Sequence, residues 1–440
     1  MPKKFVFIGS GSTMFTRNLV RDLLTFPSFA DAIIALVDID KEHLEQSRIC
    51  VDHIVKSGNY PATIIATTDR RTVLEGADGV LCTIQKNIYD QLLDIGIPDS
   101  YGVHICVGDT RGPQGIFRFL RTWPDMQAIL HDMEIMCPDA VFLNYTNPMA
   151  MLCRAMQTTS KMKVTGLCHS VQGTAEMLAH WIGASMDDIT YTCAGINHQA
   201  FYLEYKLKGR DAYPLIKEAV ARPEIYNEEQ VRNEMYLNLD YYPTESSSHN
   251  SEYNAWFRKR PDLLEKYCTH GTCEHPGLTR TAANFKEWMD QLDRWKIVND
   301  WVKEPIDLKR GHEYAASIFN AIFGDRIPFE FNGNVRNFGL IDNLPCGACV
   351  EVPVVAASEG FRSIHVGKLP PQIALLVSIN SQIEELAVEA ALTGDPRKVF
   401  HAICFDPLTS ALLSLEEIKN MTNDMLKAEA DLLPMFDHLV

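Results

Sequence analysis

The stretch "FVFIGSGSTMFTRNLVRDLL", residues 5–24, decides the fold of this chain. Its first four residues are apolar and predict a buried strand, and apolar residues recur at helical spacing from Thr13 to Thr25. Gly9 and Gly11 lie between the strand and the helix, where glycine permits a tight turn and lets backbone N–H groups approach a pyrophosphate. Met14 replaces the third glycine of the dinucleotide-binding fingerprint, so the assignment needs support from elsewhere in the sequence.

That support comes from the next apolar run, which ends "ALVDID" at residues 35–40. Asp38 stands where an acidic side chain binds an adenosine ribose, and its charge would repel a 2′-phosphate, which favours NAD over NADP. The alternative is a glycine turn in another doubly wound fold, with Asp38 serving only as a helix N-cap. The residues that we expect to bind the cofactor are Gly9, Ser10, Gly11, Ser12 and Asp38.

Short apolar runs alternate with helical patterns through the first two hundred residues. Such an alternation predicts α/β structure, here a Rossmann-like doubly wound parallel sheet with helices on both faces. The predicted strands are Phe5–Ile8, Ile33–Val37, Thr63–Thr67, Gly79–Ile84, Ala140–Leu143 and Lys163–Leu167, and the predicted helices are Thr13–Thr25, Lys41–Val55, Gln114–Met136 and Thr174–Ile182.

The order of elements is less legible after residue 200. Residues 226–239, 284–302 and 370–392 have helical patterns, and Val350–Ala356 reads as a strand. The sequence contains no internal repeat or linker-like tract. We therefore expect two closely packed domains, the Rossmann-like domain over residues 1–195 and a C-terminal α/β (α+β) domain over residues 196–440. The second domain would carry substrate, catalytic and oligomer contacts.

Composition excludes several classes of protein. The formal net charge of −16 argues against nucleic acid and anionic membrane as partners, because phosphate groups demand a basic surface. No apolar run reaches membrane-spanning length, and the start "MPKKFVFIGSGS" does not resemble a secretion signal. The 12 cysteines are scattered through apolar segments, which fits a reducing cytoplasm better than a disulfide framework. We expect a globular cytoplasmic protein with a small-molecule partner.

A cysteine and two histidines stand at the ends of apolar segments. "GLCHSVQG", residues 166–173, contains Cys168 and His169, and "CAGINHQAF", residues 193–201, contains His198. If both segments end at one sheet edge, the Cys168 thiolate and the His198 imidazole suit a divalent transition metal with positions open for substrate oxygens. Spacing alone leaves open a buried thiol, a nucleophilic cysteine and a hydrogen-bonded core histidine.

"FLNYTNPMAM", residues 142–151, marks a strand-to-helix turn at the carboxyl edge of the sheet, where open α/β folds bind ligands. Asn144 and Asn147 flank this turn. Pro148 suits the first helical position and Asn147 its cap, so a purely structural role for Asn147 is the alternative to ligand contact.

Two cysteine-rich motifs have spacings seen in structural zinc sites. They are "CTHGTC" (Cys268, His270, Cys273) and "CGAC" (Cys346, Cys349). Nothing in the sequence shows that the two motifs meet, and buried thiols are the favoured interpretation.

Several long motifs occur in a recognisable order: "GSGS" (9–12), "GDTRGPQGIFRFLRT" (108–122), "NYTNP" (144–148), "CHSVQGT" (168–174), "AGINH" (194–198) and "GNVRNFGLIDNLP" (333–345). Together they resemble glycoside hydrolase family 4, most closely its melibiase-type α-galactosidases, over nearly the whole chain. The sequence departs from the family at "GPQG", where Gln114 stands in place of the usual glycine.

The resemblance implies a role for individual residues. Cys168 and His198 match the protein ligands of a divalent metal, usually Mn²⁺, and Asn147 matches a sugar-contacting asparagine. His169 matches the position of the catalytic acid. Tyr253, in "HNSEYNAWF", matches the tyrosine base, and the adjacent Glu252 is the alternative because some relatives use a carboxylate.

The resemblance also implies an NAD-dependent hydrolysis that differs from the usual two-carboxylate mechanism. The sugar would be oxidised at C3 and deprotonated at C2, the glycosidic bond would break by elimination, and water addition and re-reduction would follow. The expected substrate is an α-galactoside such as melibiose, and an α-galacturonide or α-glucoside is the alternative. A lactate or malate dehydrogenase relative, which shares the expected fold, and an NAD-sensing binding protein are the rival classes. We expect a homodimer or homotetramer.

Overall fold

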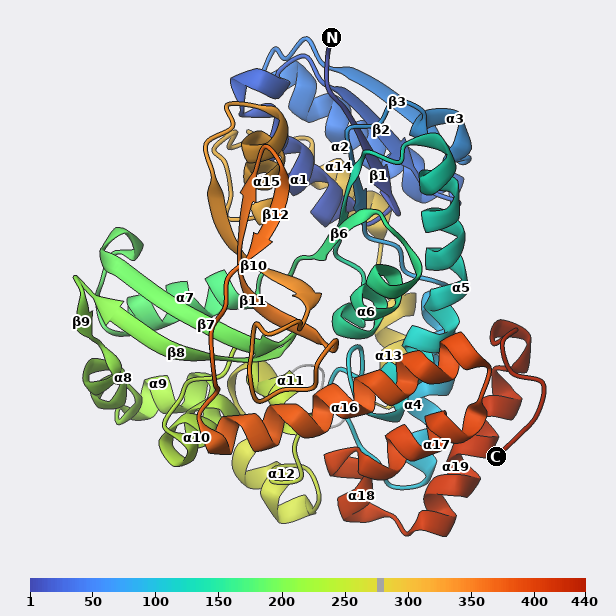
Figure 1. The fold of residues 1–440 in the computed structure, drawn as a ribbon, viewed down its shortest axis with the longest axis vertical. Helices are drawn as coiled ribbons and strands as arrows, with labels where there is room; N and C mark the ends of the chain where they lie inside the picture. The colour runs from blue at the N-terminus through green and yellow to red at the C-terminus, as the bar shows by residue number, and fades with distance from the viewer. Residues whose placement is uncertain (275–280) are drawn as a thin grey trace.

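A computed structural model describes residues 1–274 and 281–440, with side chains for residues 1–272 and 281–440. Its centre is a sheet of 12 strands in the order β3-β2-β1-β4-β5-β6-β10-β11-β7-β8-β9, with β12 paired to β11. The first six strands are parallel, and the order 3-2-1-4-5-6 is that of a Rossmann dinucleotide-binding sheet. The predicted N-terminal fold is therefore confirmed (Figure 1).

The strands and helices of the parallel part agree closely with the sequence patterns. The strands are β1 (Lys4–Ile8), β2 (Ile33–Val37), β3 (Thr63–Thr67), β4 (Gly79–Cys82), β5 (Val141–Asn144) and β6 (Lys163–Gly166). The helices are α1 (Thr13–Leu24), α2 (Lys41–Ser57), α3 (Arg71–Leu74), α4 (Gln91–Ser100), α5 (Gly112–Met136), α6 (Met149–Thr159) and α7 (Ser170–Trp181). β4 ends two residues earlier than predicted, and just beyond it Thr83 donates from its backbone N–H to the Ile8 carbonyl at 2.9 Å and from Oγ1 to the Gly9 carbonyl at 2.8 Å.

The second half extends the same sheet with antiparallel strands. They are β7 (Ile189–Ile196), β8 (Gln199–Leu207), β9 (Arg210–Asp211), β10 (Phe329–Arg336), β11 (Cys349–Ala357) and β12 (Gly360–Ser363). β10 joins β6 through the pair Asn334 and Gly166, and β11 joins β7 through Glu351 and Gly195. The domain boundary proposed at residue 195 therefore falls inside β7, one strand of a hairpin, and the sheet continues across it.

The helices of the second half pack against both halves of the chain. They are α8 (Tyr213–Val220), α9 (Pro223–Glu228), α10 (Gln230–Leu239), α11 (Ser247–Glu252), α12 (Pro261–Tyr267), α13 (Ala282–Asp290), α14 (Arg294–Trp301), α15 (Tyr314–Phe323), α16 (Pro371–Thr393), α17 (Pro396–Phe405), α18 (Pro407–Leu412) and α19 (Leu415–Ala428). Two of the predicted helices are broken in the structure. The first divides between α9 and α10 at Glu229, and the second divides between α13 and α14.

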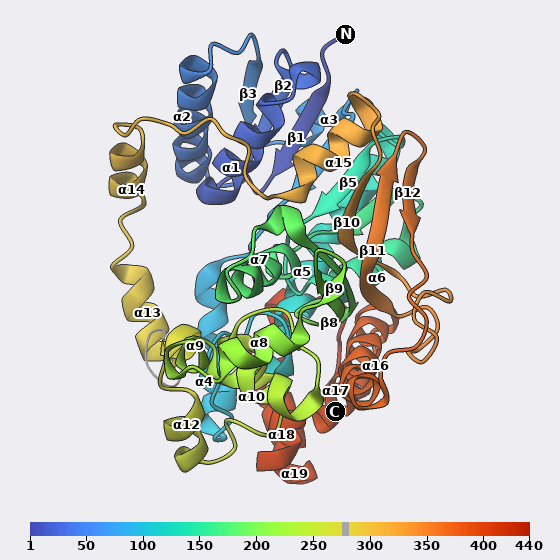
Figure 2. The same cartoon turned by 90° about the vertical axis from the view of Figure 1, so that its left-hand side faces the viewer.

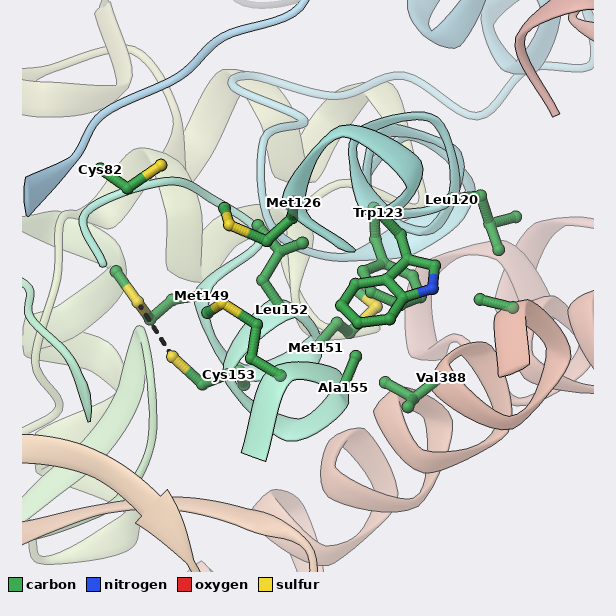
Figure 3. Close-up of a cluster of buried hydrophobic side chains, with 14 of the residues drawn as sticks. Cys82, Leu120, Trp123, Met126, Met149, Met151, Leu152, Cys153, Ala155 and Val388 are labelled. Carbon is green, nitrogen blue, oxygen red and sulfur yellow. Dashed lines mark hydrogen bonds between the residues drawn. The ribbon is translucent and has the colours of Figure 1, made fainter. Parts of the chain in front are cut away.

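The core continues from the first half into the second on both faces of the sheet. On one face, α5 and α6 pack with α16, α17 and α19, and on the other, α1, α2 and α15 cover the strands. Figure 3 shows side chains of α5 and α6 meeting Val388 of α16, with Met149 and Cys153 in contact through their sulfur atoms. Unbranched methionines fill irregular gaps of this kind. The shared core fixes the two halves relative to each other.

In the part of the chain that is described, no helix is both long and apolar enough to cross a bilayer.

The start of α6 differs from the prediction made from the sequence. Pro148 is the N-cap residue rather than the first helical residue, and the Asn147–Pro148 peptide is cis.

Candidate active site

A cavity of about 290 Å³ opens at the carboxyl edge of the parallel strands. The turns after β1, β4, β5 and β6 form one side of it, and the β7–β8 hairpin and the loops before α5 and α11 form the other. This edge, beside β1 and β4, is where a doubly wound sheet binds ligands. The residues that line it include Ser12, Thr83, Asn147, Cys168, His169 and His198.

The glycine turn, residues 9–12, packs too tightly for larger residues. Gly9 has a φ of 80°, and a Cβ atom there would lie 2.6 Å from the backbone nitrogen of Ile84. A Cβ on Gly11 would lie 2.6 Å from Oδ2 of Asp38. Ser12 is the N-cap of α1, makes no side-chain capping bond and lines the cavity. Ser10, also part of the turn, is fully buried.

Asp38 ties the glycine turn to the end of β2. Its Oδ2 accepts a hydrogen bond from the Gly11 N–H at 2.7 Å, and its Oδ1 accepts one from the Asp40 N–H at 2.9 Å. Asp40, rather than Asp38, caps α2. The alternative in which Asp38 is only a helix cap is therefore wrong.

No pattern in the sequence indicated that Arg294 lies at this turn. In Figure 2, α13 and α14 run up one side of the molecule toward α2. Arg294, at the start of α14, donates from Nη2 to the Gly11 carbonyl and from Nε to Oε1 of Gln46 at 3.2 Å. Burial lowers the pKa of Arg294, while the carboxylates of Asp38, Asp40 and Glu42 raise it.

Cys168 and His198, 30 residues apart in sequence, meet at the cavity. Sγ of Cys168 lies 3.2 Å from Nε2 of His198, and both side chains are buried. His198 sits in the tight β7–β8 turn with a φ of 62°, an uncommon conformation for a residue with a side chain. The predicted pairing of thiol and imidazole is present in the structure.

Three residues that sequence reasoning did not single out surround this pair. Glu245 places Oε2 at 3.8 Å from Nε2 of His198 and Oε1 at 3.2 Å from Nδ1 of His249. His249 in turn places Nε2 at 3.4 Å from Oδ1 of Asp109. We call Cys168, His198, Glu245, His249 and Asp109 the thiol–imidazole cluster. Their motifs, "GDTRG" and "TESSSHNSEY", were the only signal in the sequence.

Burial and charge set the protonation of the cluster. Burial lowers the pKa of His198 to about 4, which keeps its imidazole neutral. Burial also acts to lower the pKa of His249, but the Glu245 and Asp109 carboxylates raise it to about 9. Burial raises the pKa of the Cys168 thiol, so a thiolate at this position requires a neighbouring cation.

Tyr253 lies directly behind His198. Its hydroxyl oxygen is 3.4 Å from Nδ1 of His198, the ring nitrogen that faces away from Cys168, and the side chain is fully buried. The guanidinium of Arg111 lies 4.7 Å from the Tyr253 ring centroid and donates to the Asn197 carbonyl and to Glu384. Burial raises the pKa of the phenol. Tyr253 thus touches the cluster without lining the cavity.

Glu252, the alternative base, has another role. Its carboxylate accepts backbone hydrogen bonds from Cys106, Val107 and Gly108, each at 2.8 Å. These bonds hold the loop that leads to Asp109. With both oxygens occupied, Glu252 positions the loop rather than facing a substrate.

His169 stands at the rim of the cavity, next to Cys168. Its side chain is 59% exposed, its Nδ1 lies 3.8 Å from Oε1 of Glu313, and its ring is 5.7 Å from that of Phe15. An exposed imidazole beside the cavity can exchange protons with solvent. His169 therefore occupies a position suited to an acid.

The two asparagines of the "NYTNP" turn differ in place. Asn147 lines the cavity, donates from Nδ2 to Oδ2 of Asp109 at 3.1 Å, and has a buried Oδ1 without a hydrogen-bond partner among the described residues. Asn144 is fully buried and bonds to the backbone of Thr146 in both directions. Contact between Asn144 and a ligand, as predicted, is not supported, because its amide closes the turn.

The two zinc-like motifs are not brought together among the described residues. Cys346 is exposed and Cys349 is buried in β11. His270 is exposed and Cys268 is buried at the end of α12, while the Cys273 side chain lies outside the described residues. Gln114, the departure from the family motif, is buried in the first turn of α5.

A Rossmann-like sheet whose edge carries a glycine turn beside a thiol–imidazole cluster defines an enzyme that acts on a small ligand. Comparisons with known proteins name its class. Residues 4–184 match the model of family 4 glycosyl hydrolases, and residues 193–409 match the model of the family 4 glycosyl hydrolase C-terminal domain. The chain belongs to family 4 of the glycosyl hydrolases. The alternative of a lactate or malate dehydrogenase relative is therefore excluded.

The relatives extend over the whole chain. An α-galactosidase of Bacillus subtilis (strain 168) is 38% identical, with 99% of this chain and 100% of the relative covered. An α-galactosidase of Rhizobium meliloti (strain 1021) is 33% identical, with 99% and 90% covered. A crystal structure of a 6-phospho-α-glucosidase from gut microorganisms, in complex with NAD and Mn²⁺, superposes with a TM-score of 0.81 at 19% identity over 99% of this chain and 100% of that one. This last likeness concerns the fold.

Proposed function

We propose that this protein is an NAD- and divalent-metal-dependent α-galactosidase that cleaves melibiose-like substrates by oxidation, elimination, water addition and re-reduction. The observation that carries the proposal is the meeting of Cys168 and His198 at the sheet edge that also carries the glycine turn. The two α-galactosidase relatives, which match over the full chain, support the substrate class.

The glycine turn fits a dinucleotide. Gly9 and Gly11 leave no room for a Cβ atom, so the backbone is bare where a pyrophosphate would approach the N-terminus of α1. Asp38 stands at the end of β2, where a ribose hydroxyl would bind, and Ser12 is available on the cavity side. The 6-phospho-α-glucosidase of the same fold was crystallised with NAD, which supports this assignment.

The cluster fits a divalent transition metal. A neutral imidazole and a thiol lie in contact, and such nitrogen and sulfur donors suit Mn²⁺ less strongly than zinc, so oxygen ligands are needed to complete the site. Substrate hydroxyls would supply some of them. When bound, NAD⁺ accepts a hydride from the sugar, and the cation acts as a Lewis acid toward sugar oxygens and favours the thiolate and phenolate forms of its neighbours.

Three side chains of the protein would carry the remaining chemistry. Tyr253 would remove the proton at C2, after its hydroxyl moves into the cavity from its position 3.4 Å from Nδ1 of His198. The Glu252 carboxylate is held by backbone N–H groups instead. His169, at the exposed rim, protonates the departing glycosidic oxygen. Asn147 holds a sugar hydroxyl with its unpaired Oδ1, because a buried amide oxygen gains a hydrogen bond on binding.

A specific observation favours a second substrate class, α-galacturonides. Arg118 of α5 lines the cavity and donates from Nε to the Asn147 carbonyl. A guanidinium pairs well with a carboxylate such as that of a uronide. Rates on a galactoside and on the matching galacturonide separate these two candidates.

The test measures hydrolysis of p-nitrophenyl α-galactoside and melibiose with NAD⁺, Mn²⁺ and a thiol reductant. We expect both to be cleaved faster than the α-glucoside, the α-galacturonide and 6-phosphorylated glycosides. Omission of NAD⁺, or removal of metal by a chelator, is expected to abolish activity, and each addition is expected to restore it. Full activity without either cofactor would refute the mechanism, and a preference for galacturonides would refute the substrate assignment.

A further inference from the structure

Two groups of side chains in the described part of the chain place three potential metal-ligand atoms within 4.8 Å of one another. One consists of Cys168, His198 and Glu245, and the other of Asp109, His198 and His249. His198 is common to both. The two groups therefore compete for one imidazole, and their contacts decide between them.

We propose that Glu245 is a third protein ligand of the divalent cation, so that the chain binds its metal through sulfur, nitrogen and oxygen before any substrate arrives. The inference rests on the metal dependence stated under the proposed function. Glu245 supplies the carboxylate oxygen that manganese prefers and that Cys168 and His198 lack.

The geometry around Glu245 favours this role. Its Oε2 is directed toward Nε2 of His198 at 3.8 Å, the same nitrogen that contacts Sγ of Cys168. This distance is too long for a hydrogen bond, and the potential ligand atoms of Cys168, His198 and Glu245 all lie within 4.8 Å of one another. The other oxygen, Oε1, lies 3.2 Å from Nδ1 of His249, an outer contact of the kind that orients ligating carboxylates.

The backbone at Glu245 is unusual as well. Its φ is 68°, in the left-handed region that residues with a side chain seldom occupy. Such conformations are energetically unfavourable and persist where the surrounding structure requires them, often at functional sites. Here the conformation directs the side chain into the cavity, where Glu245 is one of the lining residues.

In the competing group, Asp109 and His249 already have other hydrogen-bond partners. Asp109 accepts a hydrogen bond from Thr110 Oγ1 at 2.7 Å on Oδ1 and from Asn147 Nδ2 at 3.1 Å on Oδ2. His249 contacts both Asp109 and the hydroxyl of Ser246, which is 2.7 Å from Nδ1. This group also contains no sulfur. Asp109 and His249 are better placed to support the ligands than to replace them.

A third ligand changes how the cation is held. A thiolate and a carboxylate together neutralise a divalent charge, whereas a thiolate alone leaves a net positive charge in a buried site, which is unfavourable. Metal would then stay bound between turnovers rather than being recruited with each substrate molecule. Affinity measured in the absence of sugar is therefore the decisive quantity.

The experiment titrates Mn²⁺ into chelator-treated full-length protein without substrate and follows the signal of free Mn²⁺ by electron paramagnetic resonance. Glu245→Gln is expected to raise the dissociation constant for Mn²⁺ at least about tenfold, and Glu245→Asp to give an intermediate value. Cys168→Ser serves as the positive control for loss of a ligand. Glu176→Gln, which removes another acidic side chain away from the cluster, is the matched control and is expected to bind Mn²⁺ like the wild type.

NAD⁺ binding and the melting temperature report whether each variant is folded. Mn²⁺ affinity within twofold of wild type in Glu245→Gln, with affinity lost in Cys168→Ser, overturns the third ligand and leaves the proposed function intact. A wild-type protein that binds no Mn²⁺ but hydrolyses α-galactosides overturns both this inference and the metal part of the proposed function. If Glu245→Gln fails to bind NAD⁺, the folded Glu245→Asp variant decides, and wild-type Mn²⁺ affinity in it overturns the inference.

Discussion

The glycine turn and the thiol–imidazole cluster lie at the same sheet edge but are assembled in different ways. The glycine turn is local, because one strand, one turn and one helix supply it, and a single carboxylate, Asp38, comes from the adjacent strand. The cluster draws side chains from the β6–α7 turn, the β7–β8 hairpin, the loop before α5, and α11 with the loop that precedes it. The last two segments lie more than a hundred residues apart in sequence. Backbone geometry defines the first site, and long-range packing defines the second.

This difference indicates which substitutions should impair each site. The glycine turn is expected to be sensitive to substitution at Gly9 and Gly11, where a Cβ atom would have no room. The cluster depends on residues that never touch a ligand, such as Glu252, which holds the loop before Asp109 through three backbone N–H groups. Changes in the cluster are therefore expected to affect turnover, and changes in the turn to affect cofactor affinity.

Tyr253→Phe is expected to separate turnover from cofactor affinity most clearly. Removal of the hydroxyl deletes the proposed base and its 3.4 Å contact with Nδ1 of His198, while Thr110 Oγ1 stays 3.0 Å from that nitrogen. Turnover is therefore expected to fall by about 10²–10⁴-fold while NAD⁺ and Mn²⁺ affinities stay near wild type. In the wild type, product formed in D₂O is expected to carry deuterium at C2, and substrate deuterated at C2 is expected to react more slowly. Hydrolysis that leaves C2 unlabelled, with no isotope effect at C2 or C3, would contradict the role of Tyr253.

The next effect concerns the turn. Gly9→Ala places a Cβ atom 2.6 Å from the Ile84 nitrogen at a φ of 80°, which we expect to cost on the order of 1–3 kcal/mol of stability and to weaken NAD⁺ binding by more than tenfold. Gly173→Ala, a helical position where a Cβ atom meets nothing within 4 Å, is the matched control and is expected to be neutral or stabilising. Equal effects of the two changes would show that the turn does not require glycine.

The local glycine turn could be predicted from the sequence, whereas most of the thiol–imidazole cluster could not. The parallel strands and the glycine turn were predicted because βαβ periodicity and a glycine-containing turn are local signals. Cys168 and His198 were paired by their positions at strand ends, and the structure confirms that contact. Asn144 was misassigned because proximity to the edge does not determine the direction of a side chain.

The other residues of the cluster could not be predicted from local sequence patterns. Glu245 and His249 lie in a polar stretch that reads as an ordinary connection, although the structure places His249 in α11, and Asp109 lies in the loop before α5. Their meeting depends on antiparallel strands in the second half, whose order in the sheet does not follow their order in the sequence. Arg294 was missed for the same reason, since α14 is brought to the turn only by tertiary packing.

A third test uses pH. In metal-free protein the pKa of His249 is raised to about 9 from an ordinary value near 6.5 by Glu245 and Asp109, against the opposing effect of burial. The resulting stabilisation is complete below pH 6.5, where the unfolded chain also carries the proton, and it is lost as the pH rises through about 9. We expect His249→Asn to remove this alkaline decline, on the order of 1–3 kcal/mol, in urea unfolding at pH 6 and pH 9.5. An unchanged pH dependence in the variant would contradict a charged His249.

The smallest effect is expected at the outer side of the turn. Arg294→Gln removes the hydrogen bond to the Gly11 carbonyl and the positive charge beside Asp38. Because the contact is partly solvent-exposed, we expect a change of NAD⁺ affinity of only a few fold, corresponding to less than about 1 kcal/mol. Lys296→Gln in the same helix, whose partner Asp300 is exposed, is expected to leave the affinity unchanged and serves as the control. An effect of Arg294→Gln as large as that of Gly9→Ala would mean that α14 belongs to the cofactor site.

The uninterrupted sheet has a consequence for recombination between relatives. A hybrid that joins residues 1–195 of this chain to the later part of another family member would separate β7 from β8, and the cut would pass three residues from His198. The first half alone would also expose the edge of β6 that Asn334 covers, and bare edges invite association with other chains. Exchange of specificity within this fold is therefore expected to proceed through loops that border the cavity, with the sheet inherited as a single unit.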